Sequence, residues 1–230
     1  MKIKINIRPH TAKEEFDYIL HLLKQSAFFK KNNYTIELPK HPVFLKLVQK
    51  PPKLGRFCKA DLFDLFQKEI YNPDFFKQGI SLLKNYQSMF KKAIPRFIQM
   101  NKKWGFKIFP EYKVFLTRYG PGGAYYPHEG WVIMMLDVDG TFKKTENPGE
   151  TIIHEIVHIG IRKNIVDRFN LDHYEKERLV DLICILKFGD LFPNYFIQQE
   201  VNKNIDSYVN STSINQLPQT MEKYVTDFAR

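Results

Sequence analysis

The sequence predicts an α+β fold in which a small mixed sheet packs on two helices that carry polar side chains. Three observations predict this arrangement. Ile3, Ile5 and Ile7 alternate with polar residues, which indicates a strand at 2–8. Two apolar segments, 111–120 and 131–138, are typical of further strands. Elsewhere apolar residues recur at helical spacing, most clearly around residue 154 and again after residue 174.

Length and composition indicate a globular chain. The 230 residues suit one sizeable domain, or one domain with a small appendage. Hydrophobic residues make up 43% and aromatic residues 15%, so a well-filled core can form and disorder is excluded as the main state. No segment is apolar enough for a signal peptide or a membrane span, so a cytoplasmic location is expected.

The formal net charge is +10, which favours acidic partners such as nucleic acid or an anionic membrane surface. The lysines are dispersed in pairs and form no run of five or more, which favours a solvated basic surface instead. Nucleic acid is therefore a partner suggested by charge but not by a motif. The oligomeric state leaves no mark on the sequence.

The N-terminal part reads as a small lobe of its own. The elements expected there are a strand at 2–8, a helix at 12–30 and a strand at 34–38. Two prolines and a glycine within 49–56 are typical of a linker. The sequence thus predicts an N-terminal α/β lobe over 1–50, of unassigned role, and a second domain over 58–230.

The second domain begins with helices and continues with strands. Helices are expected at 59–71 and 74–103, and Pro95 should kink or divide the longer one. The glycine- and proline-rich turn 121–130 separates the two expected strands.

Two helices should follow the strands, at 148–163 and 174–188. Asn147 can cap the first of them, Pro148 suits its first position, and Glu150 can complete a capping box.

The first of these helices contains HEIVH, in which His154 and His158 lie one turn apart on the same face. Both imidazoles can therefore reach one metal ion. Glu155 is rotated by about 100° from His154, where its carboxylate can take a proton from water activated by the metal, as in H-E-x-x-H metalloproteases. Isoleucine and valine surround these residues, so the helix should be buried, and buried polar groups need partners. The alternative is a pair of core histidines hydrogen-bonded to neighbours.

A catalytic zinc usually has three protein ligands and one open position. The metzincin continuation is excluded because Ile161 and Asn164 stand where it needs glycine and histidine. A glutamate on the next helix is the remaining common solution. Glu175 and Glu177 both qualify, and Asp181 follows Glu177 by one helical turn.

HExxH followed at this distance by ExxxD resembles the gluzincins, the thermolysin-like zinc peptidases. The resemblance covers roughly residues 110–188 and implies a zincin-like fold. It implies that Glu177 is the third zinc ligand, in preference to Glu175, and that Asp181 accepts the spare N–H of His154. Glu175, Lys176 and Arg178 are then expected to form a solvated charged face. The resemblance also implies that the strand 131–138 is the edge that pairs with a peptide substrate.

The chain departs from thermolysin because it is short. It has no counterpart of the large C-terminal helical domain that carries the transition-state histidine in thermolysin, so the group that would stabilise the transition state here is not assigned. His173 and Tyr174 are candidates because they lie near the site in sequence, and Tyr195 and Tyr208 are further candidates.

The function expected is that of a compact zinc peptidase with one Zn²⁺ per chain, acting on a peptide or protein. His154, His158 and Glu177 would hold the metal, and Glu155 would act as general base. Two alternatives stand beside it. One is a regulatory or nucleic-acid-associated protease-like protein, and the other is a metal-binding protein without catalytic activity. The cleavage specificity cannot be read from the sequence.

Overall fold

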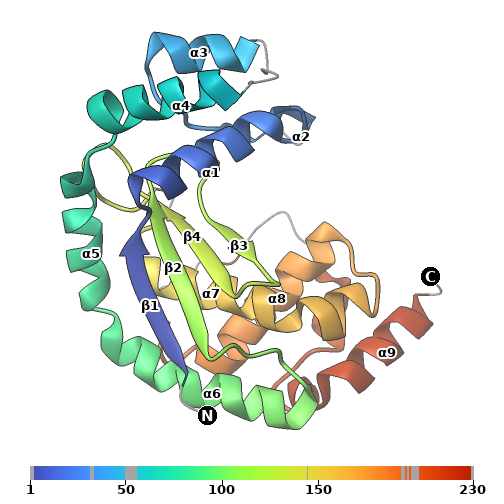
Figure 1. Ribbon diagram of the computed structural model, residues 1–230. Coiled ribbons are helices and arrows are strands. Elements are labelled where there is room, and N and C mark those ends of the chain that lie inside the picture. Colours follow the sequence, from blue (N-terminus) through green and yellow to red (C-terminus); the bar gives the residue numbers. More distant parts are fainter. Residues whose placement is uncertain are drawn as a thin grey trace.

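The computed structural model describes residues 3–31, 34–49, 56–143, 145–192, 195, 197 and 202–228. Within them the chain forms a four-stranded sheet surrounded by helices (Figure 1). The strands are β1 (Lys4–Pro9), β2 (Glu111–Thr117), β3 (Ala124–Tyr126) and β4 (Trp131–Met135). Their order is β1-β2-β4-β3. β1, β2 and β4 run parallel, and β3 is antiparallel to β4. The mixed sheet and the α+β class agree with the sequence prediction.

The expected substrate edge 131–138 is wrong. β4 pairs with β2 on one side and with β3 on the other, so it lies inside the sheet. Its nearly continuous apolar sequence, WVIMM, is what a strand buried on both faces requires. Among the described strands β1 and β3 lie at the two edges, and β3 is the edge strand beside β4. Its three residues were expected to be a turn because glycine and proline surround them.

Both faces of the sheet are covered, and side-chain alternation along the strands divides the core. Val114, Leu116 and Met134 point to the larger cluster, which includes residues of α6, α7 and α8. Phe115 and Ile133 point to the other face, which packs on α1 and α4. In Figure 1, α7 lies behind the sheet while α5 and α6 curve around its outer side beyond β1.

The N-terminal half is mostly helical. Its helices are α1 (Ala12–Lys24), α2 (Ser26–Lys31), α3 (Pro42–Gln49), α4 (Arg56–Leu65), a π-helical stretch Phe66–Ile70, a 3-10 turn Pro73–Phe76, α5 (Lys77–Lys84) and α6 (Gln87–Trp104). α1 has a capping box formed by Thr11 and Glu14. The helix expected at 12–30 is divided at Gln25.

The expected N-terminal lobe needs two corrections. β1 pairs in parallel with β2 over its whole length, so it is part of the main sheet. The strand expected at 34–38 is reduced to an isolated bridge between Glu37 and Gly120. A strand pairs where the pairing buries its apolar side chains, and its partner strand need not be near it in sequence. Most of the expected linker at 49–56 lies outside the described residues, so the boundary stays a prediction.

Pro95 was expected to kink or divide the helix at 74–103. The break lies instead at Asn85 and Tyr86, between α5 and α6. Pro95 lies inside α6, which continues to Trp104 and ends at Gly105 in the left-handed conformation. The proline therefore does not end the helix.

The C-terminal half holds α7 (Pro148–Ile161), a π-helical stretch Arg162–Asp167, α8 (His173–Phe188), two 3-10 turns at Lys203–Ser207 and Ser213–Gln216, and α9 (Leu217–Asp227). α7 starts where predicted, with Pro148 in its first position. The predicted cap is absent: the Asn147 side chain makes no capping hydrogen bond. The Asn147 N–H donates instead to the hydroxyl of Thr145, at 3.1 Å.

Among the residues that the structure describes, no helix has both the length and the apolar character needed to cross a membrane.

Candidate metal centre

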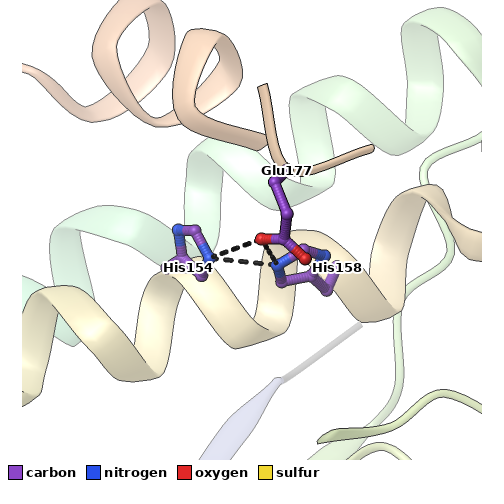
Figure 2. A group of neighbouring side chains, drawn as sticks. All are labelled: His154, His158 and Glu177. Atoms are coloured by element: carbon purple, nitrogen blue, oxygen red, sulfur yellow. Dashed lines mark hydrogen bonds and ion pairs between the residues drawn. The ribbon is translucent and has the colours of Figure 1, made fainter. Parts of the chain in front are cut away.

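Two helices bring the predicted ligands together. α7 is apolar on nearly all sides and buried, so its polar residues face a protein interior. α8 packs against α7 and is fixed at its start by a capping box between Asp172 and Glu175. Figure 2 shows His154 and His158 on one side of α7, with Glu177 reaching toward them from α8.

The three ligand atoms lie close enough for one metal ion. His154 Nε2 is 3.0 Å from His158 Nε2. Glu177 Oε2 is 3.2 Å from His158 Nε2 and 3.9 Å from His154 Nε2. Tetrahedral zinc with bonds of about 2.0–2.1 Å needs about 3.4 Å between ligand atoms. Shifts of roughly half an ångström would therefore satisfy zinc geometry, and the donor set of two imidazoles and a carboxylate is one that zinc accepts.

Both histidines are held in the neutral form, which is the form that binds metal. Burial lowers the pKa of His154 to about 3, and the neighbouring His158 adds to this effect. Burial also lowers the pKa of His158. The Nδ1 atom of His158 is buried and lacks a hydrogen-bond partner within the described part of the chain. The ring is held instead by Tyr125, which stacks on it with 4.7 Å between centroids and 4° between planes.

Glu177 is ionised and held by a lysine. Burial by itself would raise its pKa, but the hydrogen bond to His158 and the charge of Lys176 outweigh burial and lower the pKa below the usual range. Lys176 Nζ lies 2.7 Å from Glu177 Oε1 and 3.4 Å from the Tyr125 hydroxyl. One carboxylate oxygen is thus bound to the ammonium group, and the other, Oε2, faces the histidines. This arrangement favours binding of a metal through a single oxygen.

The solvated charged face expected for 175–178 is wrong. Glu175 is fully buried, Arg178 is 9% exposed, and the Lys176 side chain is 12% exposed. Arg178 makes a two-pronged ion pair with Asp206 at 2.7 and 2.6 Å. Asp206 and Tyr224 of the C-terminal region contact Arg178 and Glu175, whereas Lys176 contacts Tyr125 of β3. A charge pattern alone could not reveal these contacts.

Glu175 has a different task from Glu177. Its carboxylate accepts the N–H of Asp172 at 3.0 Å and a hydrogen bond from the Tyr224 hydroxyl. It is a structural residue at the start of α8. The ligand cluster contains Glu177, in line with the preference for Glu177 stated above.

Glu155 lies beside the ligands in an environment that disfavours its charge. Burial raises its pKa to about 8, and the negative charge of Glu177 adds to the rise. A Cβ atom at Gly123 would lie 3.3 Å from Glu155 Oε1. The carboxylate therefore lies next to the turn that enters β3, where glycine leaves room for it.

This raised pKa predicts how the metal-free protein responds to pH. Because the pKa rises from 4.5 to about 8, the folded protein binds more protons than the unfolded chain between these values. Its free energy of unfolding therefore falls as pH rises through this window. Glu155→Gln removes the effect, so with a chelator present we expect the variant to exceed wild type by about 1–3 kcal/mol near pH 9 and by much less near pH 5. Urea unfolding at both pH values measures this, with the exposed Glu129→Gln as control; equal differences at both pH values would contradict it.

Asp181 acts on His154 through a tyrosine. The direct hydrogen bond from His154 to Asp181 was the expectation. Instead the Tyr195 hydroxyl lies between them, 2.6 Å from His154 Nδ1 and donating to Asp181 Oδ1 at 2.8 Å. Asp181 itself is fully buried. The tyrosine comes from beyond α8, so the two motif helices give no sign of it.

The candidates for the transition-state group are spread apart. His173 lies at the start of α8 with its Nδ1 3.7 Å from Glu177 Oε1, and its side chain is 55% exposed. Tyr174 is 53% exposed. Tyr208 donates to Asp227 at 2.9 Å, in an exposed position. Sequence reasoning missed Tyr125, whose ring stacks on that of His158. No motif points to this residue, because it lies in the glycine- and proline-rich segment 121–130 that was expected to be a turn.

Comparisons of the chain with family models, curated proteins and solved structures gave no match.

Proposed function

We propose that the protein is a zinc-dependent peptidase that hydrolyses peptide bonds. One observation carries the proposal: two neutral imidazoles and an ionised carboxylate converge within 3.0–3.9 Å, with the carboxyl group of Glu155 beside them. Three protein ligands leave a fourth position for water, which distinguishes catalytic from structural zinc sites.

We also propose that the fold is a compact zincin-like one, as in gluzincins. Three features support it. A short antiparallel strand, β3, borders an otherwise parallel sheet, the ligand-bearing helix α7 packs against β3 and β4, and α8 follows with the third ligand. The proposal of a zincin-like fold rests on these three features together with the motif spacing.

Each site residue has a defined task in this proposal. When bound, zinc would activate water and polarise the carbonyl of the scissile bond. Glu155 takes the proton of the water and delivers it to the leaving amine. His154, His158 and Glu177 hold the metal, and Lys176 fixes Glu177 by binding its second oxygen. Burial raises the pKa of Glu155, which helps the carboxyl group to hold the proton until the leaving amine takes it. The positive charge of bound zinc would lower this pKa again, so that the carboxylate can first accept the proton from water.

The substrate is proposed to bind along β3 by strand addition. β3 is an edge strand, which offers backbone groups for pairing with an extended peptide. The turn that enters β3 contains Gly123, next to the Glu155 carboxylate. A peptide along this edge would pass close to the base. This assigns to β3 the role that the sequence suggested for 131–138.

Metal content and peptide hydrolysis test the proposal together. Purified protein is expected to contain about one zinc per chain, to cleave members of a peptide library, to lose cleavage on chelation and to regain it on adding zinc. Mass spectrometry measures the zinc and identifies the cleaved bonds. Zinc without cleavage would favour the non-catalytic metal-binding alternative. Salt-dependent binding to DNA would support the nucleic-acid-associated alternative.

A further inference from the structure

The hydroxyl of Tyr195 occupies a position that neither the HExxH motif nor the ExxxD motif defines. It lies 2.6 Å from His154 Nδ1 and 2.8 Å from Asp181 Oδ1. A stack of rings holds it: Tyr195 packs on Phe192 with 5.4 Å between centroids, and Phe192 packs on Phe188, the last residue of α8, at 5.7 Å. The ring is thus placed by α8, the helix that also provides Glu177.

The phenol has only one proton, and its neighbours decide where that proton points. A buried carboxylate only accepts hydrogen bonds, so the Tyr195 O–H donates to Asp181. The tyrosine oxygen then has lone pairs left to accept from His154 Nδ1–H.

The direction of these bonds determines the tautomer of His154. With the proton on Nδ1, the lone pair of Nε2 points away from Tyr195. That nitrogen is the atom 3.0 Å from His158 Nε2 and 3.9 Å from Glu177 Oε2. The histidine ring is thereby oriented for a metal before any metal binds. Carboxylate–histidine pairs commonly have this effect by direct contact.

We propose that Tyr195 is a positioning residue that transmits the negative charge of Asp181 to His154 and fixes the metal-binding tautomer of this histidine. The inference rests on the zinc site proposed above. It makes the metal affinity dependent on a residue outside both motif helices. Tyr208 provides a matched comparison, because its hydroxyl also donates to an aspartate, Asp227. Its ring packs on Tyr224 and Phe228, and within the described part of the chain it makes no hydrogen bond or ring contact with the three ligands.

The first arm of the test is nuclear magnetic resonance of metal-free protein labelled with ¹⁵N-histidine. Long-range ¹H–¹⁵N correlations report which ring nitrogen carries the proton, and His154→Gln identifies the signals of His154. In wild type and in Tyr208→Phe we expect the proton on Nδ1. In Tyr195→Phe we expect the hydrogen-bonded Nδ1–H signal to be lost. A proton on Nε2 in wild type would overturn the inference, and this measurement needs no variant of Tyr195 to fold.

The second arm measures zinc affinity by competition with a chromophoric chelator. Tyr195→Phe is expected to weaken zinc binding about 10-fold or more, within the range known for residues that orient metal ligands, whereas Tyr208→Phe stays within about twofold. Wild-type affinity in Tyr195→Phe would overturn the positioning role. If zinc fails to bind wild type as well, the proposed zinc site fails, and the tautomer measurement still decides the role of Tyr195.

Discussion

Replacing Glu155 with glutamine is expected to abolish peptide hydrolysis and leave zinc binding intact. Glutamine has almost the same shape as glutamate but cannot take the proton of water, and general acid–base catalysis of this kind contributes about 10²–10⁴-fold to the rate. Zinc binding should survive because Glu155 is not among the three ligands. The measurement is kcat/KM on the best library peptide, together with the zinc content of the same preparation.

Two features make this variant informative. Glutamine removes a carboxyl group whose burial disfavours its charge, so the protein should be at least as stable as wild type at neutral pH. Loss of activity would then not reflect unfolding. The control is Glu129→Gln, which changes an exposed glutamate in the turn before β4 and should retain full activity. Undiminished hydrolysis by Glu155→Gln would contradict the assignment of the base.

The clustering of the candidate ligands could be predicted from the sequence, because helix geometry converts spacing along the chain into position in space. Residues four apart on a helix share a face whatever surrounds them, so His154 and His158 needed no tertiary information. Glu177 required two things more: that the next helix pack against α7, and that the ExxxD spacing, which resembles that of gluzincins, distinguish it from Glu175. In the structure the ligand atoms of these three residues lie 3.0–3.9 Å apart.

The sheet could not be predicted to the same degree, since strand pairing depends on partners far away in sequence. β1 pairs with residues more than 100 positions later, and the alternation of polar and apolar residues in β1 does not indicate which strand will be its partner. β3 is only three residues long and lies among glycines, so local propensity favours a turn there. The resemblance to gluzincins assigned the substrate edge to the strand 131–138, which is an interior strand.

Polar contacts around the ligands were the hardest to foresee. The sequence pattern predicts that Lys176 lies on a charged helix surface. In the structure its ammonium group binds Glu177 and also contacts the Tyr125 hydroxyl, which strand β3 places beside it. Asp181 has the spacing to reach His154, yet a tyrosine that follows α8 lies between them. Both contacts depend on residues outside the motif helices α7 and α8, and motif spacing carries no information about where such residues lie.

Replacing His158 with alanine is expected to remove the stabilisation that zinc gives to the wild-type protein. A ligand that binds only the folded state, present at about a thousand times its Kd, raises the free energy of unfolding by about 4 kcal/mol. For a chain of this length that corresponds to a rise of roughly 10 °C in Tm. The His158 side chain is 3% exposed, and its Nε2 lies 3.0–3.2 Å from both other ligand atoms, so its loss removes the ligand that is close to the other two. Peptide hydrolysis should disappear together with the zinc-induced shift.

The comparison is made within each variant, because deleting a buried histidine lowers stability by itself. Thermal unfolding is recorded with chelator and then with zinc, and only the difference between the two is interpreted. His128→Ala is the control, since His128 is an exposed histidine in the turn between β3 and β4 and is not among the three clustered ligands. The control should keep the full zinc-induced shift. An equal shift in His158→Ala would mean that zinc binds elsewhere on the protein, and the ligand set proposed for the catalytic metal would then be wrong.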